Sequence, residues 1–232
     1  MYMGKKILAV IPARGGSKGI KDKNIVKVEG IPLINYTIKE ALKSKLIDKL
    51  IVSTDSERIA DIAVKGGAEV PFLRSKSLAK DETKTIEVLM DVVKQLELQG
   101  EKYDYLILLQ PTQPLRRVFH IEESIQTIIE KQLSSLVSVN EVNENPILFR
   151  TINPEKKLEA LLDINSSLRR QEYPTFFKVN GAIYINKLDE NFTVETSLND
   201  NEYPYIMDKL YDLDIDEPID IEILKLKLKE LK

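Results

Sequence analysis

Short apolar runs alternate with stretches of helical periodicity along the first 140 residues of the chain. A compact apolar run is typical of a buried strand, whereas apolar positions that recur every three or four residues indicate an amphipathic helix. The pattern predicts strands at residues 6–12, 49–53, 70–73 and 105–109, and helices at residues 32–45, 56–64, 85–99 and 118–130. Such alternation favours βαβ units, so we expect an α/β fold with a mostly parallel sheet that is covered on both faces.

The pattern becomes irregular at about residue 140. From there to residue 178, asparagine and proline punctuate a segment without a clear period, as at Pro146 and at Asn153-Pro154. The regular pattern resumes with a strand at residues 179–185, a polar loop at 189–201, a strand at 211–215 and a helix at 218–231. No linker rich in proline, glycine or serine divides the chain, so we expect one domain, residues 1–232, with residues 140–178 as an insertion.

Composition restricts the chemistry that the chain can perform. Its 43% hydrophobic and 31% charged residues are typical of a soluble globular protein. The absence of cysteine excludes thiol catalysis, zinc–thiolate sites and disulfide scaffolds, and it fits a reducing cytoplasm. No apolar run approaches the roughly 20 residues that a membrane-spanning helix needs, so we expect no membrane insertion.

Charge is unevenly distributed along the chain. The net charge of −3 excludes the broad basic field that binds a nucleic-acid backbone. Residues 14–27 nevertheless carry a local charge of +4, which leaves −7 on the rest of the chain. The cations of this segment are Arg14, Lys18, Lys21, Lys23 and Lys27, and its acid is Asp22. This local excess of positive charge predicts a binding site for a small anion.

The basic segment begins with Arg14-Gly15-Gly16-Ser17-Lys18-Gly19, directly after the first predicted strand. Glycine lets backbone N–H groups turn toward a ligand without interference from a Cβ atom, and such groups can hold a polyphosphate together with arginine and lysine. The spacing differs from a Walker A loop, and no helix follows at once, as a dinucleotide-binding fingerprint requires. We therefore expect a long loop that wraps a nucleotide. The alternative is a surface loop that its lysines keep soluble.

Acidic and apolar residues alternate near the C-terminal end of the chain, in the run Tyr-Asp-Leu-Asp-Ile-Asp at residues 211–216. In a strand, this alternation points Asp212, Asp214 and Asp216 to the same face. Like charges in a row repel one another unless a cation binds, and Mg²⁺ is usually held by one or two protein carboxylates together with substrate phosphates. The alternative is that Asp216 caps the last helix, and the two roles are compatible.

Two further segments are weaker candidates for a ligand site. Gln110 leads a proline-rich loop after a predicted strand, where open α/β sheets bind ligands, although a simple turn explains the loop equally well. Gly181, within residues 180–184, allows close approach of a ligand or marks an ordinary strand bulge. His120 is the only histidine, which argues against a histidine-based triad or metal cluster, and its place near a helix start favours an incidental role.

Six motifs occur in the chain in a fixed order. They are Ile11-Pro12-Ala13-Arg14-Gly15-Gly16-Ser17-Lys18-Gly19, Lys23-Asn24, Ser53-Thr54-Asp55, Leu108-Leu109-Gln110-Pro111-Thr112, Asn180-Gly181-Ala182-Ile183-Tyr184 and Asp214-Ile215-Asp216. Over nearly the whole chain this set resembles the acylneuraminate cytidylyltransferases, the CMP-sialic acid synthetases. The resemblance implies a three-layer, Rossmann-like nucleotide-diphospho-sugar transferase fold. It also implies that CTP and a nine-carbon 2-keto sugar acid react, with Mg²⁺, to give the CMP-sugar and pyrophosphate.

The resemblance further implies roles for individual residues. The nucleotide-binding set is Arg14, Gly15, Gly16, Ser17, Lys18, Lys23, Asn24 and Arg74. In it, Arg14, Ser17 and Lys18 would hold the triphosphate, while Lys23 and Asn24 would reach the cytosine or the ribose. Asp214 and Asp216 would be the metal ligands and, with Arg14 and Lys18, the catalytic set. The sugar-binding set is Gln110, Arg170, Asn180 and Tyr184.

The same resemblance also bears on the oligomeric state of the protein and on the sugar acid that accepts CMP. Residues 140–178 match a segment that family members exchange in a homodimer, so Arg170, a natural partner of the sugar carboxylate, would be able to serve the neighbouring subunit. Lys21 and Gln113 stand where the family usually has proline and serine, and Ile147 follows Pro146 where some members place a lysine. The acceptor therefore stays open among sialic, legionaminic and pseudaminic acids. The alternatives are a cytidylyltransferase for an eight-carbon sugar acid or a sugar phosphate, and a CTP-binding module without catalytic activity.

Overall fold

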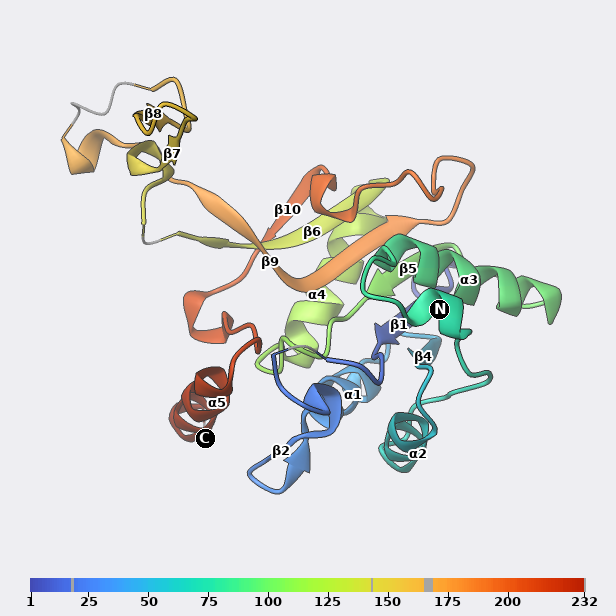
Figure 1. Cartoon of the computed structure of the whole chain (residues 1–232). Coiled ribbons are helices and arrows are strands. Elements are labelled where there is room, and N and C mark those ends of the chain that lie inside the picture. The colour runs from blue at the N-terminus through green and yellow to red at the C-terminus, as the bar shows by residue number, and fades with distance from the viewer. Residues whose placement is uncertain (18, 143, 165–168, 232) are drawn as a thin grey trace.

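A central sheet organises the computed structural model, which describes residues 1–17, 19–142, 144–164 and 169–231 (Figure 1). Within these residues the sheet has six strands, in the spatial order β10-β6-β9-β5-β1-β4. Their bounds are β1 Ile7–Pro12, β4 Lys49–Ser53, β5 Tyr105–Leu108, β6 Ser135–Glu141, β9 Phe177–Lys187 and β10 Tyr203–Ile206. β9 runs antiparallel to both of its neighbours, and the other bonded pairs run parallel. The predicted α/β class with a mostly parallel sheet is confirmed.

Helices cover both faces of the sheet (Figure 1). α1 (Leu33–Lys43), α2 (Glu57–Lys65) and α4 (Val118–Glu130) pack on one face, and α3 (Thr85–Leu98) packs on the other. Because successive strand residues point to opposite faces, Ile7 and Ile11 of β1 belong to the first of these two cores, whereas Leu8 and Val10 belong to the second. A third, smaller core joins α5 (Pro218–Glu230) to the hairpin of β2 (Lys27–Val28) and β3 (Ile31–Pro32).

Short elements connect these layers. The other hairpin of the described chain consists of β7 (Arg150–Ile152) and β8 (Leu158–Ala160), and it projects from the sheet between β6 and β9, within the predicted insertion (Figure 1). The single-turn 3-10 helices are η1 Lys23–Ile25, η2 Lys76–Ala79, η3 Pro146–Leu148, η4 Arg170–Glu172, η5 Leu198–Asp200 and η6 Lys209–Tyr211. In the part of the chain that the structure describes, no helix is long and apolar enough to cross a bilayer.

Two of the predicted strands are wrong, and two strands of the central sheet and the four short strands of the two hairpins were not predicted. Residues 70–73 form no strand, because Pro71 has no N–H for a ladder and only Glu69 makes an isolated bridge, to Ile51. Residues 211–215 contain the end of η6 and then extended chain outside any sheet. β6 and β10 were missed because β6 mixes serine and asparagine with apolar residues and β10 is a short edge strand that contains a proline. The remaining predicted strands and helices are confirmed, with ends that differ by a few residues.

The alternation at residues 211–216 has a different cause from the predicted one. Leu213 and Ile215 do turn inward, but they pack in the third core, against Leu224 of α5 and Val28 of β2. The alternation therefore reports burial against a helix and a hairpin rather than membership of the sheet. Asp216 is also not the helix cap, because Glu217 holds that position and the side chain of Asp220 accepts the free N–H groups.

His120 lies in the first turn of α4 and is buried. Its Nδ1 accepts a hydrogen bond of 3.0 Å from the backbone N–H of Arg117, and its ring lies near those of Tyr205 and Tyr211. Burial first, and then the charges of Arg116 and Arg117, lower the pKa of His120 to about 4. The histidine therefore serves as a neutral helix-capping acceptor.

We expect His120 to make the free energy of unfolding fall by about 2 kcal/mol between pH 7 and pH 5. An unfolded histidine has a pKa of about 6.5, so the unfolded chain takes up the proton first and stability is lost as the pH falls from there toward 4. His120→Gln keeps an acceptor at the same helix position and removes most of this loss. Urea unfolding at both pH values measures the effect, and an equal loss in the two proteins would contradict the assignment.

Candidate active site

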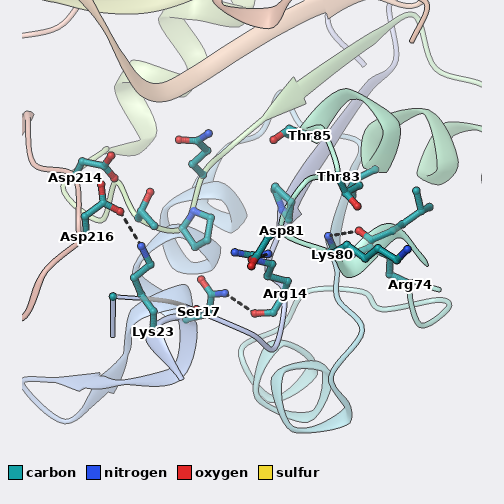
Figure 2. Close-up of a pocket in the computed structure, with 18 of the residues that line it drawn as sticks. Arg14, Ser17, Lys23, Arg74, Lys80, Asp81, Thr83, Thr85, Asp214 and Asp216 are labelled. Atoms are coloured by element: carbon teal, nitrogen blue, oxygen red, sulfur yellow. Dashed lines mark hydrogen bonds and ion pairs between the residues drawn. The ribbon is translucent and has the colours of Figure 1, made fainter. Parts of the chain in front are cut away.

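The carboxyl ends of β1 and β5 open into a pocket with a volume of about 660 Å³ (Figure 2). The pocket is lined by the Gly-rich loop after β1, by the segment of residues 74–85, which contains η2, by the loop after β5 and by the acidic segment before α5. The residues predicted from the sequence that line this pocket are Arg14, Ser17, Lys23, Asn24, Arg74, Gln110, Asp214 and Asp216. Segments far apart in the sequence thus meet at the sheet edge where open α/β proteins bind ligands.

The Gly-rich loop is fastened at its start by two hydrogen bonds. The backbone N–H of Gly15 donates to Asp55 Oδ1 at 2.8 Å, and Asn24 Nδ2 donates to the carbonyl of Arg14 at 3.0 Å. The described residues of the loop contain no helix before η1, and the first α-helix, α1, begins at Leu33, close to the position that the sequence predicts. Lys18, which the sequence places in the same loop, lies outside the described residues.

Gly19 brings the loop into contact with the acidic segment. A Cβ atom at Gly19 would lie 2.4 Å from the backbone oxygen of Asp216, so the close approach requires glycine. Lys23 strengthens the contact, because its Nζ donates to the carbonyl of Ile215 and to Asp216 Oδ1, each at 2.9 Å. The cations of the loop and the carboxylates of the acidic segment therefore face the same space (Figure 2).

Asp214 lies beside Asp216 at the pocket (Figure 2). The outer side of Asp214 is exposed, but burial by the surrounding protein raises its pKa. A hydrogen bond from Thr112 lowers this pKa, and the charge of Asp216 raises it further. The backbone N–H of Ile215 donates to the carbonyl of Thr112 at 2.9 Å, which joins the acidic segment to the loop after β5. Neighbouring carboxylates favour a bound cation. Among the described residues, no group of three or more His, Cys, Asp or Glu forms a closed metal site.

Arg74 lies at the start of the segment of residues 74–85, just before η2. Its side chain is only 7% exposed, and its Nη2 and Nη1 donate to the carbonyls of Ser53 (2.7 Å) and Leu78 (3.4 Å). Burial lowers the pKa of Arg74, against the attraction of Asp55. The arginine therefore holds this segment against the end of β4 while it also lines the pocket.

Several pocket residues in this segment were not found by sequence reasoning. They are Leu78, Lys80, Asp81, Thr83 and Thr85. Asp81 reaches across to form an ion pair with Arg14 (Figure 2). The segment is polar and has no periodicity, so the sequence alone carried no signal that would separate it from an ordinary surface loop.

The predicted sugar-site residues lie in different surroundings. Gln110 lines the pocket, and a Cβ atom at Gly181 would lie 2.6 Å from its Oε1. The buried Arg116 fixes this arrangement, because its Nη1 donates to the carbonyls of Gln110 (3.3 Å) and Ala182 (2.7 Å). Tyr184 is buried beyond them and burial raises its pKa. The side chain of Arg170 lies outside the described part of the structure.

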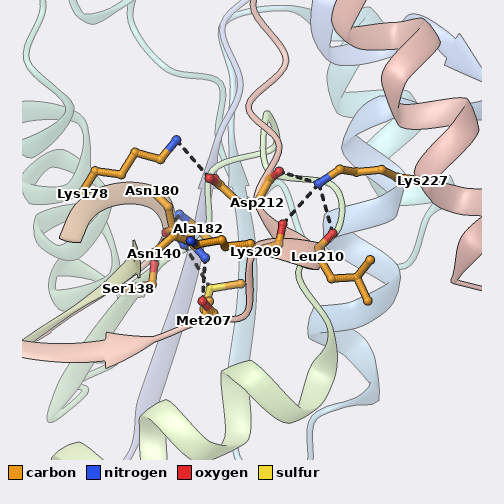
Figure 3. Close-up of polar contacts among 10 residues, drawn as sticks. All are labelled: Ser138, Asn140, Lys178, Asn180, Ala182, Met207, Lys209, Leu210, Asp212 and Lys227. Carbon is orange, nitrogen blue, oxygen red and sulfur yellow. Dashed lines mark hydrogen bonds and ion pairs between the residues drawn. The ribbon is translucent and has the colours of Figure 1, made fainter. Parts of the chain in front are cut away.

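Asn180 is buried in a polar network between β9 and β6 (Figure 3). Its Oδ1 accepts from Ser138 Oγ at 2.6 Å and from the backbone N–H of Ala182 at 3.0 Å, and its Nδ2 donates to Asn140 Oδ1. Asn180 therefore holds the bend of β9 next to Gly181. Like Tyr184 and the loop glycines 15 and 16, it is not part of the pocket lining.

Residues 8–231 match the sequence model of the family described as cytidylyltransferase. The chain belongs to the cytidylyltransferase family. This cytidylyltransferase is 36% identical over 230 residues to the CMP-N,N'-diacetyllegionaminic acid synthase of Legionella pneumophila, a match that covers 97% of each chain. It is 33% identical over 213 residues to the N-acylneuraminate cytidylyltransferase of Streptococcus agalactiae, and this match covers 91% of the present chain and 50% of the streptococcal one.

A solved structure supports the fold. A CMP:2-keto-3-deoxy-manno-octonic acid synthetase complexed with CTP superposes on this cytidylyltransferase with a TM-score of 0.72 at 17% identity, over 98% of this chain and 100% of the other. The resemblance inferred from the six motifs is confirmed at the level of family and fold. The opposed basic and acidic walls of the pocket suit a polyphosphate and a cation that lie between them.

Proposed function

We propose that this cytidylyltransferase transfers CMP from CTP to the anomeric hydroxyl of a nine-carbon 2-keto sugar acid. The observation that carries the proposal is the pocket itself, in which the Gly-rich loop with Arg14 and Lys23 faces Asp214 and Asp216. In the reaction the hydroxyl oxygen bonds to the α-phosphorus and the bond from this phosphorus to the bridging oxygen of the β-phosphate breaks. Pyrophosphate leaves with the electron pair, and the hydroxyl proton passes to solvent.

The Gly-rich loop binds the nucleotide in this proposal. Arg14 and Ser17 contact the triphosphate, together with Lys18 of the same loop and the backbone N–H of Gly16, while the N–H of Gly15 bonds Asp55 and fixes the loop. Asn24 donates its Nδ2 to the chain, which leaves its Oδ1 for the ribose or the cytosine. Support for this assignment comes from the fastening of the loop to Asp55, because a preorganised set of donors loses little entropy on binding.

Asp214 and Asp216 are the proposed Mg²⁺ ligands. Two carboxylates at a pocket edge match the small number of protein ligands that Mg²⁺ uses when phosphates and water complete its shell. Burial is the main cause of the raised pKa of Asp214 and the charge of Asp216 adds to it, and a bound cation would offset the repulsion between the two carboxylates. When bound, the metal supplies positive charge that offsets the charge developing on the transferred phosphoryl group. Lys23, which now bonds Asp216, then turns toward the nucleotide.

The acceptor site is proposed to lie beside Gln110, on the side of the pocket next to β9. Gln110 offers an amide to the sugar hydroxyls, and Arg116 and Asn180 hold the loop and the bend of β9 that shape this side. Arg170 is proposed as the partner of the sugar carboxylate, with Tyr184 nearby. The chain is further proposed to act in the cytoplasm as a homodimer joined through residues 140–178, where Ile152 and Leu158 are each 71% exposed.

Pyrophosphate release with CTP and Mg²⁺ tests the acceptor class. N-acetylneuraminic, legionaminic and pseudaminic acids and 3-deoxy-octulosonic acid are offered in parallel, with reactions lacking acceptor as controls. We expect release with at least one nine-carbon acid, at a kcat/KM at least about tenfold above the eight-carbon acid. Release with the eight-carbon acid alone would move the enzyme to the other acceptor class, and binding of CTP without turnover on any acceptor would indicate a binding module.

A further inference from the structure

Residues 209–216 are fixed by hydrogen bonds and ion pairs from side chains, whereas a strand is fixed by backbone hydrogen bonds to neighbouring strands. The segment begins with η6 (Lys209–Tyr211), continues as extended chain to α5 and pairs with no strand in the described chain. Backbone carbonyls that are shielded from water are costly unless some other donor meets them. Their partners are therefore the main question about this segment, because it ends in the two pocket carboxylates.

Lys227 of α5 bonds three carbonyls at η6 and at the start of the extended stretch, and one of them, the carbonyl of Lys209, also accepts the backbone N–H of Asp212. Its Nζ donates to the carbonyls of Lys209 (3.3 Å), Leu210 (3.2 Å) and Asp212 (2.9 Å) (Figure 3). An ammonium group has three N–H donors, so Lys227 commits its full hydrogen-bonding capacity to this turn. Bonds from a charged donor are about twice as strong as bonds between neutral groups. Lys227 thus ties the turn at residues 209–212 to the following helix.

Lys178 fastens the same point from the opposite side. At the start of β9, its Nζ forms an ion pair of 3.0 Å with Asp212 Oδ2 (Figure 3). Asp212 is therefore bonded through its carbonyl by Lys227 and through its carboxylate by Lys178. Asp214 follows two residues later, and the single backbone bond from Ile215 to the loop after β5 is the next fixed point along the chain.

We propose that Lys227 is a positioning residue for the Asp214–Asp216 pair, and that it sets the affinity for the divalent cation without contacting substrate. The proposal rests on the assignment of these carboxylates as metal ligands made above. Lys227 does not line the pocket, so it acts only through the backbone of residues 209–212. Displacement of a reacting group by about 1 Å can reduce turnover about 10²-fold. Loosening of the turn at residues 209–212 is therefore expected to displace the two carboxylates enough to lower turnover.

The test compares Lys227→Met with Lys225→Met. Methionine keeps most of the apolar stem and removes the three donors. Lys225 lies on the same helix and forms an ion pair of 2.6 Å with Glu222, so its replacement reproduces the loss of one charge from α5. The primary readout is calorimetric titration of Mg²⁺ into the complex with CTP, without acceptor and hence without turnover. CTP binding in EDTA and the melting temperature are measured alongside.

We expect Lys227→Met to weaken Mg²⁺ binding about fivefold or more and to lower kcat about tenfold, while CTP binding in EDTA changes less than about twofold. Lys225→Met has nearly the same Mg²⁺ affinity, kcat and CTP affinity as the unsubstituted protein. Lys227→Arg recovers at least half of the lost Mg²⁺ affinity. If Lys227→Met does not fold, Lys178→Met replaces it, with a loss of about two- to threefold in Mg²⁺ affinity expected from the weaker constraint.

Two results would overturn the inference, and they are distinguishable. A lower melting temperature in Lys227→Met with unchanged Mg²⁺ affinity would show that Lys227 only stabilises the packing of α5. Unchanged Mg²⁺ affinity in Asp214→Asn as well would instead remove the metal assignment itself, and the role of Lys227 with it.

Discussion

Asp214→Asn lowers kcat about 10³-fold, while the affinity for CTP measured without divalent cation stays within about twofold of the unsubstituted protein. The loss follows from the proposed role of the carboxylate, because a metal contributes several kcal/mol to the stabilisation of transferred charge and each 1.4 kcal/mol changes the rate about tenfold. Asparagine keeps the size of the side chain and removes only its charge. Single-turnover pyrophosphate release and calorimetry measure the two quantities separately.

Asp212→Asn is the matched control for this prediction. It is the same substitution two residues earlier, and the sequence pattern makes the two aspartates look equivalent. In the structure, Asp212 points to Lys178 rather than to the pocket, so we expect kcat to fall less than about tenfold. Equal losses in Asp212→Asn and Asp214→Asn would contradict the separation of a fastening carboxylate from a metal-binding one.

Gly19→Ala is expected to lower kcat/KM for CTP about 10²-fold, because the loop and the acidic segment must separate. The new methyl group would lie 2.4 Å from the backbone oxygen of Asp216, and a backbone atom cannot rotate away as the end of a side chain can. Lys23 would then no longer reach both Ile215 and Asp216 in the present geometry. Steady-state kinetics with CTP varied at saturating acceptor measure the loss.

Gly16→Ala provides the comparison in stability. Among the described residues other than its chain neighbours, no atom lies within 4 Å of a Cβ atom built at Gly16. We therefore expect Gly16→Ala to melt at the same temperature as the unsubstituted protein, whereas Gly19→Ala melts at a lower temperature. Wild-type kinetics in Gly19→Ala would contradict the proposed contact between the loop and the acidic segment.

The sequence was sufficient to predict the framework of the site. The apolar runs that became β1 and β5 are buried on both faces, so their pattern is strong, and the loops that follow them lie at one sheet edge by topology alone. The glycines and cations directly after β1 therefore predict a phosphate site from the sequence alone. The basic loop and the loop that begins at Gln110 are both found in the pocket.

The remaining features depend on contacts between distant residues. Alternation in the acidic segment indicated which side chains are buried, but not that α5 rather than a strand buries them. The segment with Asp81 is brought to the pocket by the hydrogen bonds of Arg74 to Ser53 and Leu78. No local sequence pattern predicts these bonds. The role of Asn180 is also not visible in the sequence, because the sequence does not distinguish an asparagine that holds buried structure from one that binds a ligand.

The central claim is that this pocket moves CMP from CTP to a sugar acid. Phosphorus NMR of the enzyme with CTP, Mg²⁺ and the best acceptor of the panel tests it most directly, because it reports which bond breaks. The account predicts that the three resonances of CTP give way to one phosphodiester resonance and one pyrophosphate resonance in equal molar amounts, and only when acceptor is present. Formation of CDP and inorganic phosphate, or CTP that stays intact with every acceptor, would contradict it.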